Sequence, residues 1–500
     1  MGSYSQMKAP VSNGWLALKI KLRLPRQSPP ALWLILGMSA LGLSILLPRL
    51  YVLAVVAAIA GWVLVIVTLG SLTQGRVDWI VLGWITFFPL GYYFLSFPAT
   101  RPLFTLDRAV IALLILGAIS IGRPRAFPML TDVRVAGWWW LGFLVISLLS
   151  IWELPYSEMI PPLRILIDSF AMPAFLCWLI MCHFDVRKNL AWLHACSCIM
   201  SAYIWAIGFA ELVTGRNLLQ FTDTTQFTQS GDVKLMRVDG PFESGTSYAL
   251  IGIIGFFFIL YLRRYLPKRL PVWQATLHWV GVLAALGVGL MPMHRGLVVA
   301  LIAVCLVDYF SNIHLVSRRS WQVLWLFLLA GIVTAKILVP ELYSDRVTGT
   351  DNIYSRLAQH KQTVQVITDH PIIGVGIDRF YTAVSMSPRY FTSFRGFDSM
   401  NFAHNTILLI AAETGILGLM CYLLAQFFFA RAIWRTRKIN PLGCETFFCL
   451  FMIYTIFGLD VTVGYFSDIN LWYMLTFGVI TQLQARSVAE ALQLRSGPNV

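Results

Sequence analysis

Long apolar stretches dominate the chain, and short polar segments separate them along almost its whole length. A transmembrane helix needs about 20 mostly apolar residues to cross the hydrocarbon core of a bilayer. Fourteen stretches approach that length: 31–47, 51–70, 79–97, 105–121, 136–152, 164–182, 190–212, 247–262, 273–291, 296–310, 321–339, 411–430, 444–459 and 467–484. The pattern predicts an all-α polytopic membrane protein, a bundle of about 12–14 transmembrane helices with a helical outer loop domain.

Composition supports this prediction. The 500 residues are 58% hydrophobic and 12% charged, whereas soluble domains are about 45–50% apolar and about 25% charged. Residues 1–30 are basic but lack an apolar core followed by a small-residue cleavage site, so we expect a cytoplasmic tail rather than a signal peptide.

The distribution of charge predicts the orientation. With the N-terminus inside and fourteen spans, the inner segments hold 23 of the 38 Lys and Arg residues but only 4 of the 24 Asp and Glu residues. This is the positive-inside bias of an inserted helix bundle. Both termini are then cytoplasmic. The net charge of +14 needs no nucleic-acid partner, and the lipid membrane is the expected partner.

The same reading divides the chain into five parts. They are a cytoplasmic tail (1–30), a transmembrane bundle of about eleven spans (31–339), an extracytoplasmic helical loop domain (340–404), C-terminal transmembrane helices (405–484) and a second cytoplasmic tail (485–500).

The outer segment 340–404 is long, and connections of such length are commonly functional. Its stretch "NIYSRLAQHKQTVQVITDHP" has helical periodicity, with apolar positions near one face (Ile353, Leu357, Val364, Ile367) and polar ones on another (Arg356, His360, Thr363). The proline closes that helix, and the two glycines of "IIGVGIDRF" suit a tight turn. We expect a helical cap over the bundle.

Three basic residues on the predicted outer side stand beside apolar sequence: Arg237, Arg295 and His404. Taken singly, such arginines are commonly interfacial anchors, and such a histidine is commonly a surface residue. Taken together, the guanidinium groups suit a diphosphate, because they form charge-assisted bidentate hydrogen bonds. An imidazole titrates near neutrality and accepts a proton from a hydroxyl. By contrast, His360 is interpreted as a surface residue and Asp460 as the marker of an outer turn.

Other chemistries lack their residues. The chain has no P-loop, no Asp-x-Asp pair and no nucleophile motif around a serine or cysteine. The eight cysteines lie in or beside proposed spans, so no disulfide framework is indicated. His194-x-Cys196-x-Cys198 is only faintly similar to a metal cluster, because no fourth ligand is near, and packing is the favoured interpretation. We expect no metal and no cofactor.

Four stretches, in order, resemble the bacterial O-antigen ligase and polymerase superfamily. "RVDGPFESGTSYALIG" (237–252) is similar to its Arg-x-x-Gly-x-Phe block, and "HRGLVVALI" (294–302) to its Ser-Arg-Gly/Thr block. "SRLAQHKQTVQVITDHPIIGVGIDRF" (355–380) resembles its outer-loop signature, and "AHNTILLIAAETGILGL" (403–419) its His-Asn block with a later Glu-x-Gly. The N-terminal half is similar only as a membrane bundle.

The resemblance implies a metal-independent enzyme of the bacterial inner membrane. It would move a glycan from a polyprenyl-diphosphate-linked oligosaccharide onto a hydroxyl of a glycan or lipid acceptor at the periplasmic face. On this chain, Arg237 and Arg295 would hold the diphosphate, and His404 would deprotonate or orient the acceptor hydroxyl. Arg356 would contact donor phosphate or sugar, and Asn405 would orient the His404 ring.

Two further residues are supporting candidates. Glu413, nine residues after His404, is expected to be a buried packing or network residue rather than a base. His294 stands where the family commonly has serine, and "ESGTSYA" replaces its usual Pro-Asn, two differences that bear on donor fit.

The acceptor separates two versions of this function. A polymerase extends another lipid-linked repeat unit, whereas a ligase glycosylates lipid A-core or a protein side chain. The long N-terminus and the number of spans favour a polymerase or exopolysaccharide assembly. A lipid-linked glycan flippase is the alternative, although a transporter should carry charged or Gly/Pro-broken helices at the membrane midplane. A structural subunit of a cell-envelope complex is a third possibility.

Overall fold

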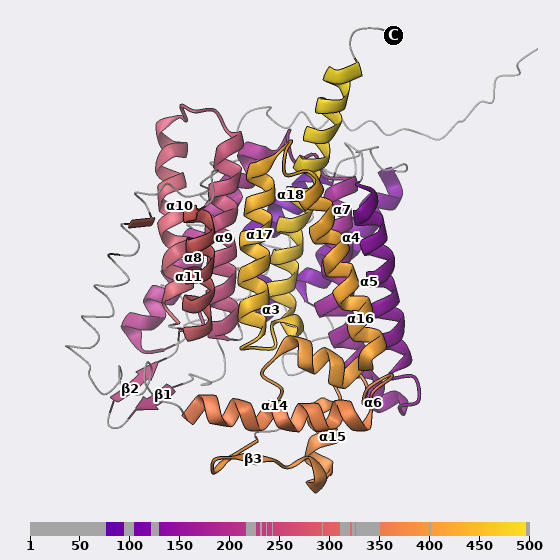
Figure 1. Ribbon diagram of the computed structural model, residues 1–500. Helices are drawn as coiled ribbons and strands as arrows, with labels where there is room; N and C mark the ends of the chain where they lie inside the picture. The colour runs from indigo at the N-terminus through magenta and orange to yellow at the C-terminus, as the bar shows by residue number, and fades with distance from the viewer. Residues whose placement is uncertain are drawn as a thin grey trace, which may run out of the picture. The chain divides into compact units, whose positions relative to one another are not determined.

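The computed structural model describes residues 77–94, 105–121, 130–216, 227–230, 233–236, 238–242, 244–292, 294–310, 321–322, 326, 351–399 and 402–496 (Figure 1). The chain divides into two compact units, Met1–Val56 and Ala57–Val500, and every described residue lies in the second. The expected spans 31–47, 51–70 and 321–339 lie largely or wholly outside the described residues, as does Arg237. The domain boundaries therefore stay a prediction.

Helices make up nearly all of the described structure, which confirms the all-α fold. The longer ones are α3 (Asp78–Phe94), α4 (Leu106–Ile121), α5 (Thr131–Leu149), α6 (Tyr156–Ile165), α7 (Met172–Cys182), α8 (Leu190–Thr214), α9 (Gly245–Tyr265), α10 (Val272–Leu290), α11 (Arg295–Phe310), α14 (Asp351–Asp369), α16 (Thr406–Arg435), α17 (Pro441–Gly458) and α18 (Ser467–Ser496). A π-helical turn, η1 (Leu166–Ala171), joins α6 to α7. Each expected span between 79 and 310, and each from 411 onward, overlaps one of these helices, except that 164–182 runs from the end of α6 through η1 and α7.

Seven of the described helical segments are long and apolar enough to cross a membrane: Thr131–Leu149, Tyr156–Cys182, Leu190–Thr214, Gly245–Tyr265, Val272–Leu290, Thr406–Arg435 and Pro441–Gly458. The protein is therefore an integral membrane protein. Helix α9 lies deepest, with nearly all of its side chains buried against α8, α10, α17 and α18. Such a helix is apolar around its whole circumference because it meets other helices on every side.

The remaining elements are short. Two antiparallel hairpins are described, β1 (Phe227–Ser230) with β2 (Val233–Met236), and β3 (Ser393–Phe394) with β4 (Phe397–Asp398). Helix α15 (Phe380–Met386) and the 3₁₀ turns η3 (Pro388–Tyr390) and η4 (Val463–Tyr465) complete the list.

The helix expected in the outer loop is α14, and it ends just before His370 and Pro371. Figure 1 shows it lying across one end of the bundle, next to the start of α16, against which it packs. Its apolar positions Ile353, Leu357 and Val364 are 55%, 41% and 50% exposed. The polar face is the buried one, with Gln362 and Thr363 fully enclosed.

Helix α16 is broken near its start, and the segment after α14 fills the break. Gly415 has φ 66° and ψ −171°, outside the helical region. The Ile416 amide donates to the Pro371 carbonyl (2.8 Å), and the amides of Val375 and Gly376 donate to the carbonyls of Ala412 (3.0 Å) and Glu413 (2.9 Å). Backbone groups that the break would leave unpaired are thus satisfied by the adjacent segment.

This contact requires glycine on both sides. A Cβ at Gly374, where φ is +78°, would lie 2.3 Å from the carbonyl carbon of Glu413. A Cβ at Gly415 would lie 2.1 Å from the carbonyl oxygen of Ile372. The "GVG" and "ETG" motifs therefore form one backbone-to-backbone interlock, which we call the glycine interlock (Gly374, Gly415 and the backbone groups they contact).

Substitution of Gly374 by alanine tests the interlock against a matched control, Gly396→Ala. Both glycines have positive φ, +78° and +83°, so both variants carry a backbone cost of about 1–2 kcal/mol. Only Gly374→Ala adds a clash, because nothing lies within 4 Å of a Cβ at Gly396. We expect Gly374→Ala to lower the thermal unfolding midpoint much further, as measured by tryptophan fluorescence in detergent. Equal shifts in the two variants would contradict the interlock.

Candidate functional site

Basic residues from three distant segments meet where α14 crosses the bundle. Arg295 is the first residue of α11, Arg356 lies on α14, and His404 stands two residues before α16. The charge of Arg295 acts on Arg356, and the charge of Arg356 acts on His404, so Arg356 lies within electrostatic range of both. We call Arg295, Arg356 and His404 the basic cluster.

An acidic residue, Asp460, pairs with Arg356 of this cluster. The Arg356 guanidinium forms an ion pair with the Asp460 carboxylate and donates to the Asp460 backbone carbonyl at 2.7 Å. A Cβ at Gly296 would lie 2.5 Å from Asp460 Oδ2, so this carboxylate also faces the first turn of α11. Asp460 thus does more than mark a turn. In the sequence it is one acid among several near span ends, and no spacing links it to Arg356.

Burial, reinforced by neighbouring basic residues, keeps His404 neutral. Burial lowers the pKa of His404 from 6.5 to about 4, and the neighbouring Arg356 and His360 add to this effect. Burial and the neighbouring Arg295 likewise lower the pKa of Arg356. At neutral pH the His404 imidazole therefore has a free lone pair and can accept a proton.

His360 belongs to the site although the sequence suggested a surface residue. Its side chain hydrogen-bonds the backbone of His404, and burial, followed by Arg356, lowers its pKa. Its Nε2 atom is buried with no hydrogen-bond partner among the described residues. Only the four-residue spacing from Arg356 on a helix indicates this placement in the sequence.

The start of α16 positions His404. The Asn405 side chain caps the helix by accepting from the Leu408 amide at 3.0 Å, and its Nδ2 donates to the Leu459 carbonyl at 3.4 Å. Thr406 Oγ1 donates to the Val461 carbonyl at 3.0 Å. The segment that carries His404 is thereby tied to the turn that carries Asp460.

The supporting candidates occupy different places. His294 Nε2 lies 3.4 Å from Thr246 Oγ1 at the start of α9, and its ring packs edge-on against Phe457. The Glu413 carboxylate accepts from the amides of Asp378 (2.9 Å) and Phe380 (3.1 Å) and from the Tyr465 hydroxyl. Glu413 is thus a buried network residue that joins the segment after α14 to α16.

A hydrogen-bonded contact with α8 fixes the segment that follows Arg237. The buried Glu211 carboxylate accepts from the amides of Asp239 (3.2 Å) and Gly240 (2.7 Å). Val238 is buried as well. Arg237 itself lies outside the described residues, so its role stays a prediction.

The face of α14 that turns inward carries polar atoms without partners. Gln359 Oε1, both amide atoms of Gln362 and Gln365 Oε1 are buried and have no hydrogen-bond partner within the described ranges. Buried polar groups are normally paired, because an unpaired one costs free energy. These atoms lie on the same helix as Arg356.

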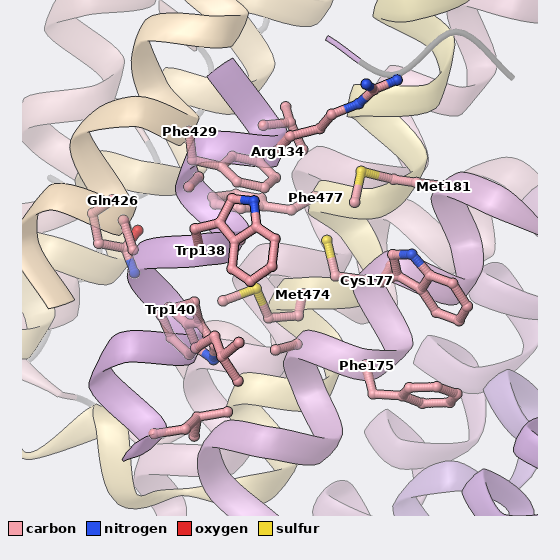
Figure 2. A pocket seen from close by; sticks show the side chains of 18 of the residues that line it. Arg134, Trp138, Trp140, Phe175, Cys177, Met181, Gln426, Phe429, Met474 and Phe477 are labelled. Atoms are coloured by element: carbon pink, nitrogen blue, oxygen red, sulfur yellow. The ribbon is translucent and has the colours of Figure 1, made fainter. Parts of the chain in front are cut away.

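A large apolar pocket lies elsewhere, between α5, α7, α16 and α18. Its volume is about 560 Å³, and Figure 2 shows Trp138, Phe175 and Phe429 around it with Arg134 at its edge. None of the candidate site residues lines it. This pocket is therefore separate from the basic cluster.

Fold and candidate site together define a class of protein: a helical membrane protein with an arginine–histidine cluster at one end of its helices. Residues 242–423 match the family model described as O-antigen ligase. This match, over 182 of the 500 residues, supports an O-antigen ligase/polymerase-type family and, in general terms, a membrane glycan ligase or polymerase. The match includes Arg295, Arg356 and His404 and leaves Arg237 and Asp460 outside. No curated protein matches the chain.

Substitution of Arg356 by glutamine should raise the pKa of His404. The value of about 4 in the unaltered protein should move toward 6.5 but not reach it, because burial, the larger cause, persists. Hydrogen–deuterium exchange at the imidazole C2 position, followed by mass spectrometry, measures this pKa for individual histidines. Arg389→Gln is the control, since Arg389 is exposed and pairs with Asp369 instead. An unchanged His404 midpoint in Arg356→Gln would refute the coupling.

Proposed function

We propose that the protein transfers or polymerises a glycan from a polyprenyl-diphosphate donor onto a hydroxyl acceptor at the extracytoplasmic end of the bundle. The observation that carries this proposal is the basic cluster beneath α14. Its two guanidinium groups would provide an anion site, and its neutral imidazole would provide a proton acceptor within electrostatic range of Arg356.

The distribution of basic residues supports the orientation. Helices α9 and α16 begin at the end of the bundle that carries the cluster, and their opposite ends carry Arg263, Arg264 and Arg435. Arg435 pairs there with Asp132 at 2.7 Å. Because basic residues mark cytoplasmic ends, the basic cluster would face the other side. Both termini would then be cytoplasmic.

The donor diphosphate would bind Arg295 and Arg356, with Arg237 as a further predicted ligand. Arg356 is paired with Asp460, and the incoming phosphate would compete with that carboxylate. As the bond between sugar C1 and the phosphate oxygen breaks, negative charge grows on the leaving diphosphate. The arginines would therefore stabilise the transition state more than the ground state.

His404 would take the proton of the acceptor hydroxyl as the acceptor oxygen bonds to sugar C1. The electron pair of the broken C1–O bond remains on the diphosphate. A pKa of about 4 makes the imidazole a weak base in the free protein, but an anionic donor beside it would raise that pKa. Donor binding would thus prepare the base, and Asn405 would hold its backbone in place.

The inward glutamines of α14 would bind sugar hydroxyls. Their buried amide groups lack partners among the described residues, and hydroxyl groups of a glycan both donate and accept hydrogen bonds. The surrounding α14 and α16 would exclude water, which would otherwise hydrolyse the donor.

Removal of the imidazole by His404→Ala tests the central step. We expect a loss of activity of about 10²–10⁴-fold, the usual contribution of a general base, with little change in the unfolding midpoint. Arg295→Ala and Arg237→Ala should each lose activity as well. Surface glycan from a deletion strain that carries each variant would be examined by gel electrophoresis. The exposed Arg389→Ala is the control.

The same gels separate the two versions of the function. Loss of the ladder with a single attached unit indicates a polymerase, whereas unattached lipid-linked polymer indicates a ligase. Normal glycan in all three variants would remove the proposed site.

Gln362→Leu separates a ligand-binding role from a structural one. Replacement of a buried, unpaired amide by an apolar side chain of similar size should leave the unfolding midpoint unchanged or raise it. If Gln362 binds glycan, the KM for the glycan substrate rises in an assay with purified lipid-linked donor. Lys361→Gln, on the exposed face of α14, is the control. An unaltered KM with a raised midpoint would count against glycan binding at this face.

A further inference from the structure

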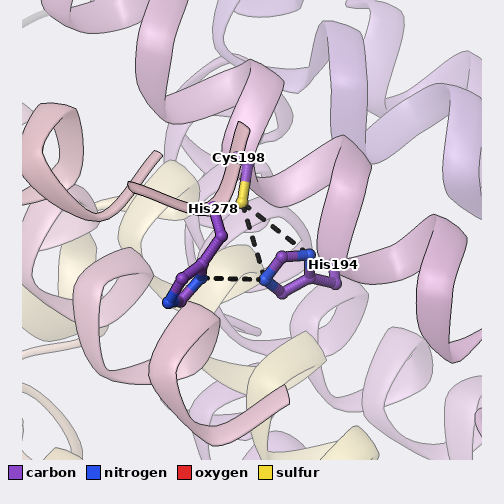
Figure 3. A group of neighbouring side chains, drawn as sticks. All are labelled: His194, Cys198 and His278. Atoms are coloured by element: carbon purple, nitrogen blue, oxygen red, sulfur yellow. Dashed lines mark hydrogen bonds between the residues drawn. The ribbon is translucent and has the colours of Figure 1, made fainter. Parts of the chain in front are cut away.

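A second cluster of reactive side chains lies between α8 and α10, away from the basic cluster. His194 and Cys198 stand one turn apart on α8, and His278 comes from α10 (Figure 3). His194 Nε2 lies 3.1 Å from His278 Nδ1, and Cys198 Sγ lies 3.8 Å from His194 Nε2. All three residues are buried, and their potential ligand atoms lie within 4.8 Å of one another.

Close helix packing brings these three residues together. A Cβ at Gly281 of α10 would lie 2.6 Å from the Cβ of Cys198, so the two helices can approach this closely only with glycine at that position. His278 is one turn before Gly281 and therefore meets the same face of α8. The sequence brings out only the pattern His194-x-Cys196-x-Cys198; the third ligand is separated from it by 80 residues or more.

The distances suit one bound metal ion. In zinc sites, imidazole nitrogen lies about 2.0–2.1 Å from the metal and thiolate sulfur about 2.3 Å from it. Ligand angles of about 100–125° around one ion then give nitrogen–nitrogen distances of about 3.1–3.6 Å and sulfur–nitrogen distances of about 3.3–3.9 Å. The separations of 3.1 Å and 3.8 Å fall within these ranges.

The charge of the site selects the ion. One thiolate and two neutral imidazoles carry a single negative charge, so a monovalent cation makes the buried site neutral, whereas a divalent one leaves a net positive charge. Arg263 lies close enough to act electrostatically on both histidines, which adds to the cost of excess positive charge. No fourth His, Cys, Asp or Glu joins the group in the part of the chain that the structure describes.

We propose that His194, Cys198 and His278 form a three-coordinate Cu(I) site that joins α8 to α10. Thiolate and imidazole are ligands that copper prefers, and soft thiolate ligation selects the cuprous state. In the absence of the ion, the two imidazoles share a hydrogen bond. The bound ion replaces that hydrogen bond by three metal–ligand bonds across the helix pair.

The site is structural rather than catalytic. His194 precedes Glu211 by seventeen residues on α8, which corresponds to about 26 Å along the helix axis. Glu211 holds the segment next to Arg237, so the copper site lies toward the opposite end of α8 from the candidate reaction site. Its occupancy should affect the stability of the bundle and not the pH dependence of glycan transfer.

The test is a titration of the purified full-length protein with Cu(I), under anaerobic conditions in detergent, against a chromophoric Cu(I) chelator. We expect one Cu(I) per chain and a rise in the thermal unfolding midpoint on binding. Cys198→Ser and His278→Asn should each weaken binding more than about 100-fold, since each removes a direct ligand. Cys196→Ser, two residues from Cys198 and outside the cluster, should bind like the unaltered protein.

X-ray absorption of the unaltered protein provides a measurement that does not depend on the variants. One sulfur at about 2.3 Å and two nitrogens at about 2.0 Å around copper are expected. The proposal is overturned if no Cu(I) binds, if Cys198→Ser and His278→Asn bind as tightly as Cys196→Ser, or if Zn(II) binds more tightly than Cu(I). A copper shell without sulfur would overturn it as well.

Discussion

The glycine interlock is the contact on which the candidate site depends. Helix α14 is held over the bundle because the segment after it pairs its backbone with the break in α16, through the Pro371, Val375 and Gly376 hydrogen bonds. The Glu413 carboxylate extends this contact by accepting from two further amides, of Asp378 and Phe380. Because backbone groups make most of the contact, its geometry is set by helix termini and turns rather than by flexible side chains.

The interlock also explains why His404 and Arg356 lie near each other. The same α16 that pairs with the segment after α14 begins two residues after His404, and its Asn405 cap joins it to the turn that carries Asp460. A rigid frame of this kind allows like charges to be held close together. Asp460 offsets part of their repulsion, and an anionic substrate would offset the rest.

Prediction from sequence succeeded for residues within recognisable blocks and failed for residues outside them. Helical periodicity predicted α14, and apolar length predicted the membrane fold. The position of Glu413 within an apolar stretch predicted its place in a buried network. The sequence predicted only a turn residue at Asp460 and a surface residue at His360, because the contact partners of each come from other segments. Likewise, the sequence pointed to His194 and Cys198 but not to His278, which only the approach of α8 to α10 supplies.

The amphipathic pattern of α14 shows the limit of such prediction most clearly. Periodicity identified its two faces correctly, yet the polar face is the buried one and Ile353 and Val364 are exposed. A pattern of side chains states which face is apolar, but the surroundings decide whether that face turns inward. The amino-acid sequence alone therefore determined the helices, because apolar length and hydrogen bonding within each segment are local properties. The tertiary structure decided which charges meet and which face is covered, because these depend on contacts between segments far apart in the chain.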